Sequence, residues 1–170
     1  MGNTMMDINI EKLTLNVGAG KDHDKLEKGV KLIEYLTGIT PVKTKSNKRI
    51  PGWGVRPGLP IGCKVTIRGK KKKELIKKFV EAKDNLLKPS QFDNNGNVSF
   101  GVHEYINIPG IKYHPEIGIM GFQIAITLSK PGKRVANRRL GKRKVPMKQR
   151  VSREEAIDFM KKEFNVELDE

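Results

Sequence analysis

Residues 60–69 read PIGCKVTIRG, and apolar side chains alternate in this stretch with glycine, polar and cationic residues. The apolar set is Ile61, Cys63, Val65 and Ile67, and the other set is Gly62, Lys64, Thr66 and Arg68. Alternation with a period of two predicts a half-buried β-strand that has one apolar face and one polar face. Because Cys63 belongs to the apolar set, we interpret it as a small packed residue and not as a nucleophile.

The same alternation recurs on both sides of this segment. Residues 10–17 place Leu13, Leu15 and Val17 on one face and Lys12, Thr14 and Asn16 on the other, and residues 121–129 form the clearest strand of the chain. Shorter strands are expected at residues 42–45 and 98–100. Apolar residues at helical spacing predict a helix that begins near Asp22 or Asp24, a helix over residues 72–87 and a last helix that begins at a capping box, Ser152-Arg153-Glu154-Glu155.

These elements predict an α+β fold. Strands that bury only one face are typical of an antiparallel or mixed sheet with helices packed on one face. At 170 residues the chain fits a single domain, residues 1–170. We expect this domain to include a functional loop over residues 46–59 and an extended basic arm over residues 130–151.

Composition favours a polyanionic partner. The chain has 34 Lys and Arg against 19 Asp and Glu, which gives a formal net charge of +15. A charge this far from zero indicates an acidic polymer, most commonly nucleic acid. The single cysteine excludes an internal disulfide and a CxxC metal knuckle. With no apolar run near the roughly 18 residues of a membrane helix, and no apolar core for a secretory signal, we expect a cytoplasmic protein with no membrane partner.

Two thirds of the excess charge lies in the basic arm. It holds ten basic residues and no acid, namely Lys130, Lys133, Arg134, Arg138, Arg139, Lys142, Arg143, Lys144, Lys148 and Arg150. Self-repulsion would extend such a segment, and one interpretation is a solvated, disordered loop. The alternative, which we favour, is an arm whose ten unneutralised cations bind the phosphates of a nucleic acid and release counterions.

A second acid-free stretch covers residues 41–62 and contains the only tryptophan, Trp53. Its four glycines and four prolines predict that the tip of this stretch is a loop without helix or strand pairing. A loop of about 15 residues in a compact domain is uncommon unless it is functional or disordered. Trp53 either packs back onto the core or stacks on a nucleotide between Arg49 and Arg56.

The open face of the predicted sheet suits RNA. It would present Asn16, Thr66, Arg68 and Thr127, which supply hydrogen bonds and positive charge with few acids nearby. Recognition of a folded RNA by shape, 2′-hydroxyl and phosphate contacts needs these groups. The alternative is an ordinary solvated sheet face.

Catalytic motifs are incomplete in this chain. Gly18-Ala19-Gly20-Lys21 differs from a phosphate-binding loop because Asp22 follows the lysine. His103-Glu104 begins like a zinc-protease helix, but Asn107 stands where the second histidine ligand is needed. We therefore expect no enzyme activity, no cofactor and no metal site.

Several motifs, in order, resemble one known family. They are KLTLNVGAG at residues 12–20, VKTK at 42–45, PIGCKVTIRG at 60–69, FGVHE at 100–104 and PGI at 109–111. Together they resemble ribosomal protein L-five, the large-subunit family that binds 5S ribosomal RNA, over roughly residues 8–130. The basic arm and the last helix resemble the archaeal and eukaryotic branch of that family.

The resemblance implies a structural protein of the large ribosomal subunit that holds 5S rRNA in the central protuberance. Asn16, Thr66 and Arg68 match family positions that contact this RNA, whereas a glutamine contact of bacterial members falls near Ile39 or Thr40 here. The loop before PIGCK would reach towards the P-site tRNA and the intersubunit bridge. Further partners would be large-subunit rRNA and neighbouring proteins of both subunits.

We expect two sets of binding residues. The rRNA-binding set is Lys12, Asn16, Lys43, Lys45, Lys64, Thr66, Arg68, Arg134, Arg138, Arg139, Lys142, Arg143 and Lys144. The tRNA-contact set is Lys48, Arg49, Trp53 and Arg56. Two other functions stay open at this point, a non-specific basic RNA-binding or assembly protein and an RNA-processing enzyme.

Overall fold

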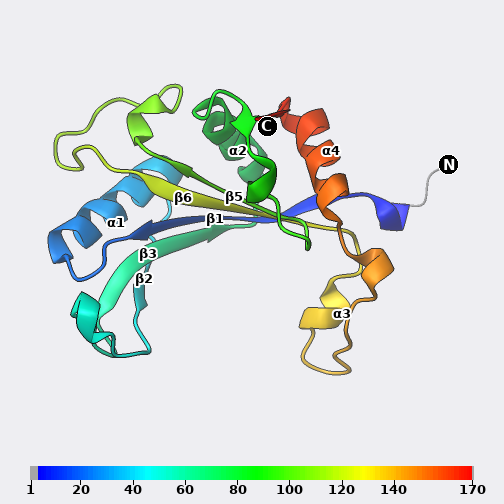
Figure 1. Cartoon of the computed structure of the whole chain (residues 1–170), viewed down its shortest axis with the longest axis horizontal. Helices are drawn as coiled ribbons and strands as arrows, with labels where there is room; N and C mark the ends of the chain where they lie inside the picture. The colour runs from blue at the N-terminus through cyan, green and yellow to red at the C-terminus, as the bar shows by residue number, and fades with distance from the viewer. Residues whose placement is uncertain (1–3, 170) are drawn as a thin grey trace. The chain divides into compact units, whose positions relative to one another are not determined.

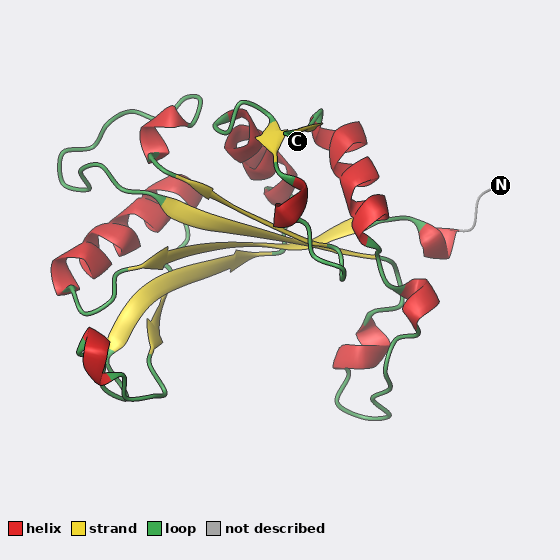
Figure 2. Ribbon diagram, in the orientation of Figure 1, coloured by secondary structure: helices red, strands yellow, loops and turns green. Residues whose placement is uncertain are grey.

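Five strands form one antiparallel sheet in the order β2-β3-β1-β6-β5 (Figure 1). The structure is a computed structural model that describes residues 4–169. The strands of this sheet are β1 (Asn9–Gly18), β2 (Val42–Lys45), β3 (Pro60–Ile67), β5 (Asn97–Val102) and β6 (Phe122–Ser129). Together with the helices shown in Figure 2, they confirm the predicted α+β class.

The chain divides into two compact units. The central unit contains Thr14–Ile67 and Gly101–Ile124. The terminal unit contains Arg68–Phe100 and the described residues of 1–13 and 125–170. Strands β1, β5 and β6 contribute residues to both units. The single domain expected from the chain length stays a prediction.

In the central unit, helix α1 (His23–Thr37) covers one face of the strands. The side chain of Asp22 caps its first turn by accepting from the N–H groups of Asp24 and Lys25. A Cβ added at Gly29 would lie 2.9 Å from Val17 Cγ1 and 3.3 Å from Cys63 Sγ, so only glycine lets α1 approach this closely. Val17 and Cys63 are buried on the covered face, as the alternation predicts.

In the terminal unit, helices α2 (Lys72–Glu81) and α4 (Arg153–Phe164) lie on one side of the strands, and the basic arm extends to the other side (Figure 1). The capping box predicted at Ser152 is present, since its hydroxyl accepts from the N–H of Glu155 at 3.2 Å. Ile76, Phe79 and Met160 are fully buried apolar side chains, each worth about 1.5–3 kcal/mol relative to exposure.

The predicted helix over residues 72–87 is wrong beyond Glu81. Asp84 and Asn85 adopt positive φ angles of 57° and 58°, a conformation that short polar side chains tolerate and that stops a right-handed helix. Strand β4 (Leu86–Leu87) follows and pairs in parallel with strand β7 (Glu167–Leu168). This two-stranded sheet was not predicted from the sequence.

Short helices occupy the loops and the arm. The arm contains the four-residue helix α3 (Arg134–Asn137). Single turns of 3₁₀-helix lie at η1 (Thr4–Met6), η2 (Pro51–Trp53), η3 (Pro89–Gln91), η4 (Tyr105–Asn107) and η5 (Met147–Gln149). The strand expected at residues 98–100 is longer than predicted, and the turn before it positions Gly96 beneath the arm.

Candidate nucleic-acid interface

The uncovered face of the central unit is polar and accessible. Lys64 and Thr66 are exposed on β3, where they alternate with buried Cys63 and Val65. Asn16 is half-buried on β1, and its side-chain amide donates a hydrogen bond to Gln123 Oε1 on β6 at 3.1 Å. The pair orients both amides and leaves further donors and acceptors for a ligand. Gln123 was not among the binding residues expected from the sequence, and this contact to Asn16 makes it a further candidate.

Two further predicted residues belong to the terminal unit. Lys12 is half-buried on β1, and Arg68 is exposed directly after the last residue of β3. Neither side chain forms an ion pair within residues 4–169. Their positive charges are therefore uncompensated by a carboxylate of the described chain.

The strand register places Lys43 away from Lys64. Strand β2 pairs with β3 in antiparallel fashion, with Lys43 opposite Cys63 and Val42 opposite Lys64. Directly opposed residues share a face, so Lys43 lies on the face of Cys63, and an irregularity in the ladder separates Thr44 from Lys45. Lys43 and Lys45 are exposed on an edge strand, and RNA contact by them would come from this edge.

Cys63 itself is a buried packed residue, as interpreted from the sequence. Its side chain has no exposed surface, and burial raises the pKa of the thiol to about 11, although the positive charge of Lys43 acts in the opposite direction. The thiol is therefore protonated at neutral pH and is not a nucleophile.

The loop over residues 46–59 is closed by its own backbone. Ser46 N–H donates to Leu59 O at 2.9 Å, and Gly58 N–H donates to Ser46 O at 2.8 Å. Ile50 and Val55 form an antiparallel bridge with N–H···O distances of 2.9 and 3.1 Å, and η2 lies between them. The expectation that proline and glycine exclude helix and strand pairing from this loop is wrong. The short 3₁₀-turn η2 tolerates proline at its start, and the pairing uses Ile50 and Val55, which have backbone N–H groups to donate.

Trp53 lies at the surface of this loop. It is 72% exposed, so it does not pack back onto the core. Lys48, Arg49 and Arg56 are also exposed, and the loop contains no acidic residue. The structure excludes packing of Trp53 onto the core. The other alternative, stacking on a nucleotide, stays a prediction.

Two of the ten cations in the basic arm are neutralised. Lys130 is buried, and its Nζ lies 2.7 Å from Glu155 Oε1, while Lys133 pairs with Glu11. The hydrogen bond from Lys130 lowers the pKa of the Glu155 carboxyl. The expectation of ten unneutralised cations is therefore corrected, because acids distant in the sequence reach the root of the arm. The eight others, all exposed, are Arg134, Arg138, Arg139, Lys142, Arg143, Lys144, Lys148 and Arg150.

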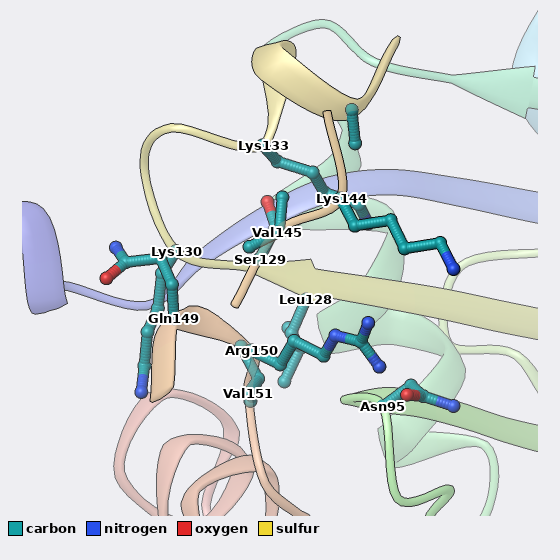
Figure 3. A pocket seen from close by; sticks show the side chains of 11 residues that line it. Asn95, Leu128, Ser129, Lys130, Lys133, Lys144, Val145, Gln149, Arg150 and Val151 are labelled. Carbon is teal, nitrogen blue, oxygen red and sulfur yellow. The ribbon is translucent and has the colours of Figure 1, made fainter. Parts of the chain in front are cut away.

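Backbone and side-chain hydrogen bonds fold the arm on itself. Arg143 N–H donates to Val135 O at 3.2 Å, and Arg138 Nε donates to Gly141 O at 2.9 Å. Beneath the arm lies a hollow of about 280 Å³, shown in Figure 3. This hollow could not be predicted from the sequence, since its lining comes from three separate segments.

Neither a metal site nor a membrane-spanning helix is found in the part of the chain that the structure describes. No three His, Cys, Asp or Glu side chains among residues 4–169 gather as a metal site. Within the same residues, no helix has the length and apolar character needed to span a membrane.

Comparisons with known proteins match nearly the full length of this chain. A family model described as "Ribosomal protein L5" matches residues 3–56, and the model of that family's C-terminus matches residues 60–159. The chain belongs to the ribosomal protein L5 family. The predicted resemblance is confirmed, and membership in a family of structural ribosomal proteins agrees with the prediction that the chain is not an enzyme.

Archaeal relatives cover this chain almost completely. A protein of Sulfurisphaera tokodaii named "Large ribosomal subunit protein uL5" is 48% identical over 98% of this chain and 94% of its own length. Proteins of the same name from Methanosphaera stadtmanae and Nanoarchaeum equitans are 46% and 45% identical, over 98% and 99% of this chain and 99% of each relative. The match includes the arm and the last helix.

Proposed function

We propose that the chain is a structural constituent of the large ribosomal subunit that binds ribosomal RNA, 5S rRNA in particular, in the central protuberance. The observation that supports this most strongly is the polar open face of the central unit, with Asn16, Lys64, Thr66 and Gln123, in a member of the ribosomal protein L5 family. The names of the relatives support the assignment to the large ribosomal subunit. The protein then works at the ribosome in the cytoplasm.

The open face would bind RNA by position and shape. Lys64 supplies a cation for a phosphate, and Thr66 and the Asn16–Gln123 pair supply hydrogen bonds for sugar hydroxyls. In the terminal unit, Lys12 on β1 and Arg68 directly after β3 would be contacts of their own. Because phosphate contacts fix orientation, these residues would hold the RNA without any chemical step.

The loop over residues 46–59 would contact the P-site tRNA and the bridge to the small subunit. Its exposed Trp53 offers a stacking surface, and Lys48, Arg49 and Arg56 offer cations around it. Backbone closure of the loop supports this role, because a preformed loop loses less conformational entropy on binding. Neighbouring proteins of both subunits and large-subunit rRNA would complete the partners.

Binding of the purified chain to 5S rRNA and to a control RNA of the same length, across a salt series, tests this function. We expect 5S rRNA to be bound more tightly at about 0.2 M salt, since structured recognition survives where phosphate attraction weakens. Substitution Thr66→Val with Gln123→Ala should reduce this selectivity, whereas Tyr35→Phe, which removes a hydroxyl on helix α1 at the covered face, should not. Equal affinity for both RNAs at every salt concentration would contradict the proposal.

A second candidate function is a non-specific, electrostatic RNA-binding protein. The eight exposed cations of the arm favour it, because they attract any polyphosphate. The same salt series separates the two functions. Affinity that is equal for unrelated RNAs, with one common salt slope, supports the electrostatic function alone.

A further inference from the structure

The hollow beneath the basic arm has a rigid apolar floor. Leu128 and Val151 form this floor and are 1% and 3% exposed. Leu128 N–H donates to Gly96 O at 2.9 Å, and a Cβ added at Gly96 would lie only 2.6 Å from Val151 Cβ. The floor is therefore packed without slack between β6, the turn before β5 and the end of the arm.

The walls of the hollow leave apolar surface accessible in the most cationic part of the chain. Ala136 on α3 and Val145 after it line the hollow and are only half-buried. An arm that served only to attract phosphates would need no apolar recess. The combination of apolar walls and a cationic rim indicates a ligand with one flat or apolar part and one anionic part.

Only two of the four cations that line the hollow are uncompensated. Lys130 pairs with Glu155 and Lys133 pairs with Glu11, whereas Lys144 and Arg150 form no ion pair within residues 4–169. Among the described residues 4–169, no acidic residue lines the hollow. Figure 3 shows the side chains of Lys144 and Arg150 extending towards the side on which Asn95 lies. The uncompensated positive charge is thus placed along one rim.

We propose that this hollow receives a single unstacked nucleotide of an RNA strand. The base would lie against Ala136, Val145 and the floor, and its phosphate would lie at Lys144 and Arg150. A volume of about 280 Å³ is close to the lower end, roughly 300 Å³, of small-ligand pockets, and apolar side chains accept extruded bases in other nucleic-acid-binding proteins. The inference rests on the proposed binding of ribosomal RNA and adds a specific nucleotide subsite to it.

Titration of the full chain with uridine 5′-monophosphate tests the subsite directly. The methyl NMR signals of Ala136, Val145 and Val151 report on the walls and the floor. At constant ionic strength, we expect the nucleotide to change the chemical shifts of these methyl signals. Equimolar inorganic phosphate should leave the chemical shifts unchanged. Equal shifts with phosphate, no shift with the nucleotide, or larger shifts with a glutamate peptide would overturn the proposal.

Two matched substitutions locate the effect. Val145→Trp fills the hollow and should weaken binding of the nucleotide about tenfold, a size typical of a lost base contact. Met147→Trp adds the same ring at a position that is 79% exposed and does not line the hollow, so affinity should be unchanged. If both variants bind the nucleotide like the unsubstituted chain, the subsite does not exist.

Two double variants that each remove two cations keep the test decisive if Val145→Trp does not fold. Lys144→Ala with Arg150→Ala should weaken nucleotide binding more than Lys142→Ala with Lys148→Ala, which removes two exposed cations outside the lining. Equal losses in the two double variants would overturn the subsite. Failure of the subsite alone leaves selective binding of 5S rRNA intact, whereas failure of the proposed function removes that selectivity in the unsubstituted chain.

Discussion

The loop over residues 46–59 and the basic arm have similar compositions but are ordered by different interactions. Both are free of acidic residues and rich in lysine, arginine, glycine and proline. The loop is closed by hydrogen bonds between its own backbone groups, at Ser46 and at the Ile50–Val55 bridge. The root of the arm is instead attached by ion pairs to Glu155 and Glu11, which lie outside it.

The difference shows what composition leaves undetermined. A cationic segment without acids can still become ordered if its backbone groups satisfy one another, as in the loop. It can also become ordered if acids from other elements reach its ends, as in the arm. Within residues 4–169, none of the loop cations Lys48, Arg49 and Arg56 forms an ion pair, whereas the arm uses Lys130 and Lys133 for anchoring and exposes the other eight.

The largest expected effect separates two glycines with similar positive φ angles. Gly96, under the arm, has φ +75° and no space for a Cβ, and Gly58, in the loop, has φ +84° and open space around it. Gly96→Ala should destabilise the chain by about 3 kcal/mol, from left-handed strain and overpacking against Val151. Gly58→Ala should cost about 1 kcal/mol, from strain alone. Urea unfolding measures both.

This pair of glycines also provides its own control. Since the backbone cost is common to both substitutions, the difference between them reports the contact with Val151. Equal destabilisation by the two substitutions would mean that the floor of the hollow is loosely packed, and the contrast between loop and arm would then be lost.

Most of the sheet could be predicted because each strand buries one face. The alternation at Cys63 and Val65, or at Ile124 and Ile126, is a local signal of a global arrangement, and it predicted β3 and β6 closely. The capping box at Ser152 was equally readable, because it depends on residues three positions apart.

The parts that escaped prediction depend on partners distant in the sequence. Strand β4 forms only because β7 pairs with it, and each strand has just two residues. Lys130 is recognised as buried only once Glu155 is placed beside it. Similarly, the Asn16–Gln123 pair joins residues 107 positions apart. Each of these contacts joins segments that become neighbours only in the folded chain, and no local pattern in the sequence marks them.

A second prediction compares the ligand contacts of the loop and the arm. Trp53→Ala should weaken binding of tRNA about tenfold, through lost stacking, and leave the slope of log affinity against log salt unchanged. Replacing Arg138, Arg139 and Arg143 by alanine should weaken RNA binding and reduce that slope by about 2–3. Trp53→Phe, which keeps an aromatic ring, is the control. A change of slope with Trp53→Ala would assign the loop to phosphate attraction instead.

The smallest expected effect is a pH dependence that belongs to the arm and not to the loop. The hydrogen bond from Lys130 holds the pKa of Glu155 below its usual 4.5, so the folded state favours the ionised carboxylate. A depressed folded pKa contributes stability above the unfolded pKa, and this contribution is lost as the pH falls through the folded value. Because Glu155 is partly exposed, we expect less than about 1 kcal/mol.

Unfolding in urea between pH about 5 and 3 measures this contribution. The free energy of unfolding of the unsubstituted chain should fall more steeply than that of Lys130→Met, because the variant lacks the cation that depresses the pKa of Glu155. Lys142→Met removes an exposed arm cation that has no ion pair within residues 4–169, and its pH profile should stay parallel to that of the unsubstituted chain. Parallel profiles for all three chains would show that the ion pair does not anchor the arm, and the arm would then depend, like the loop, on its backbone.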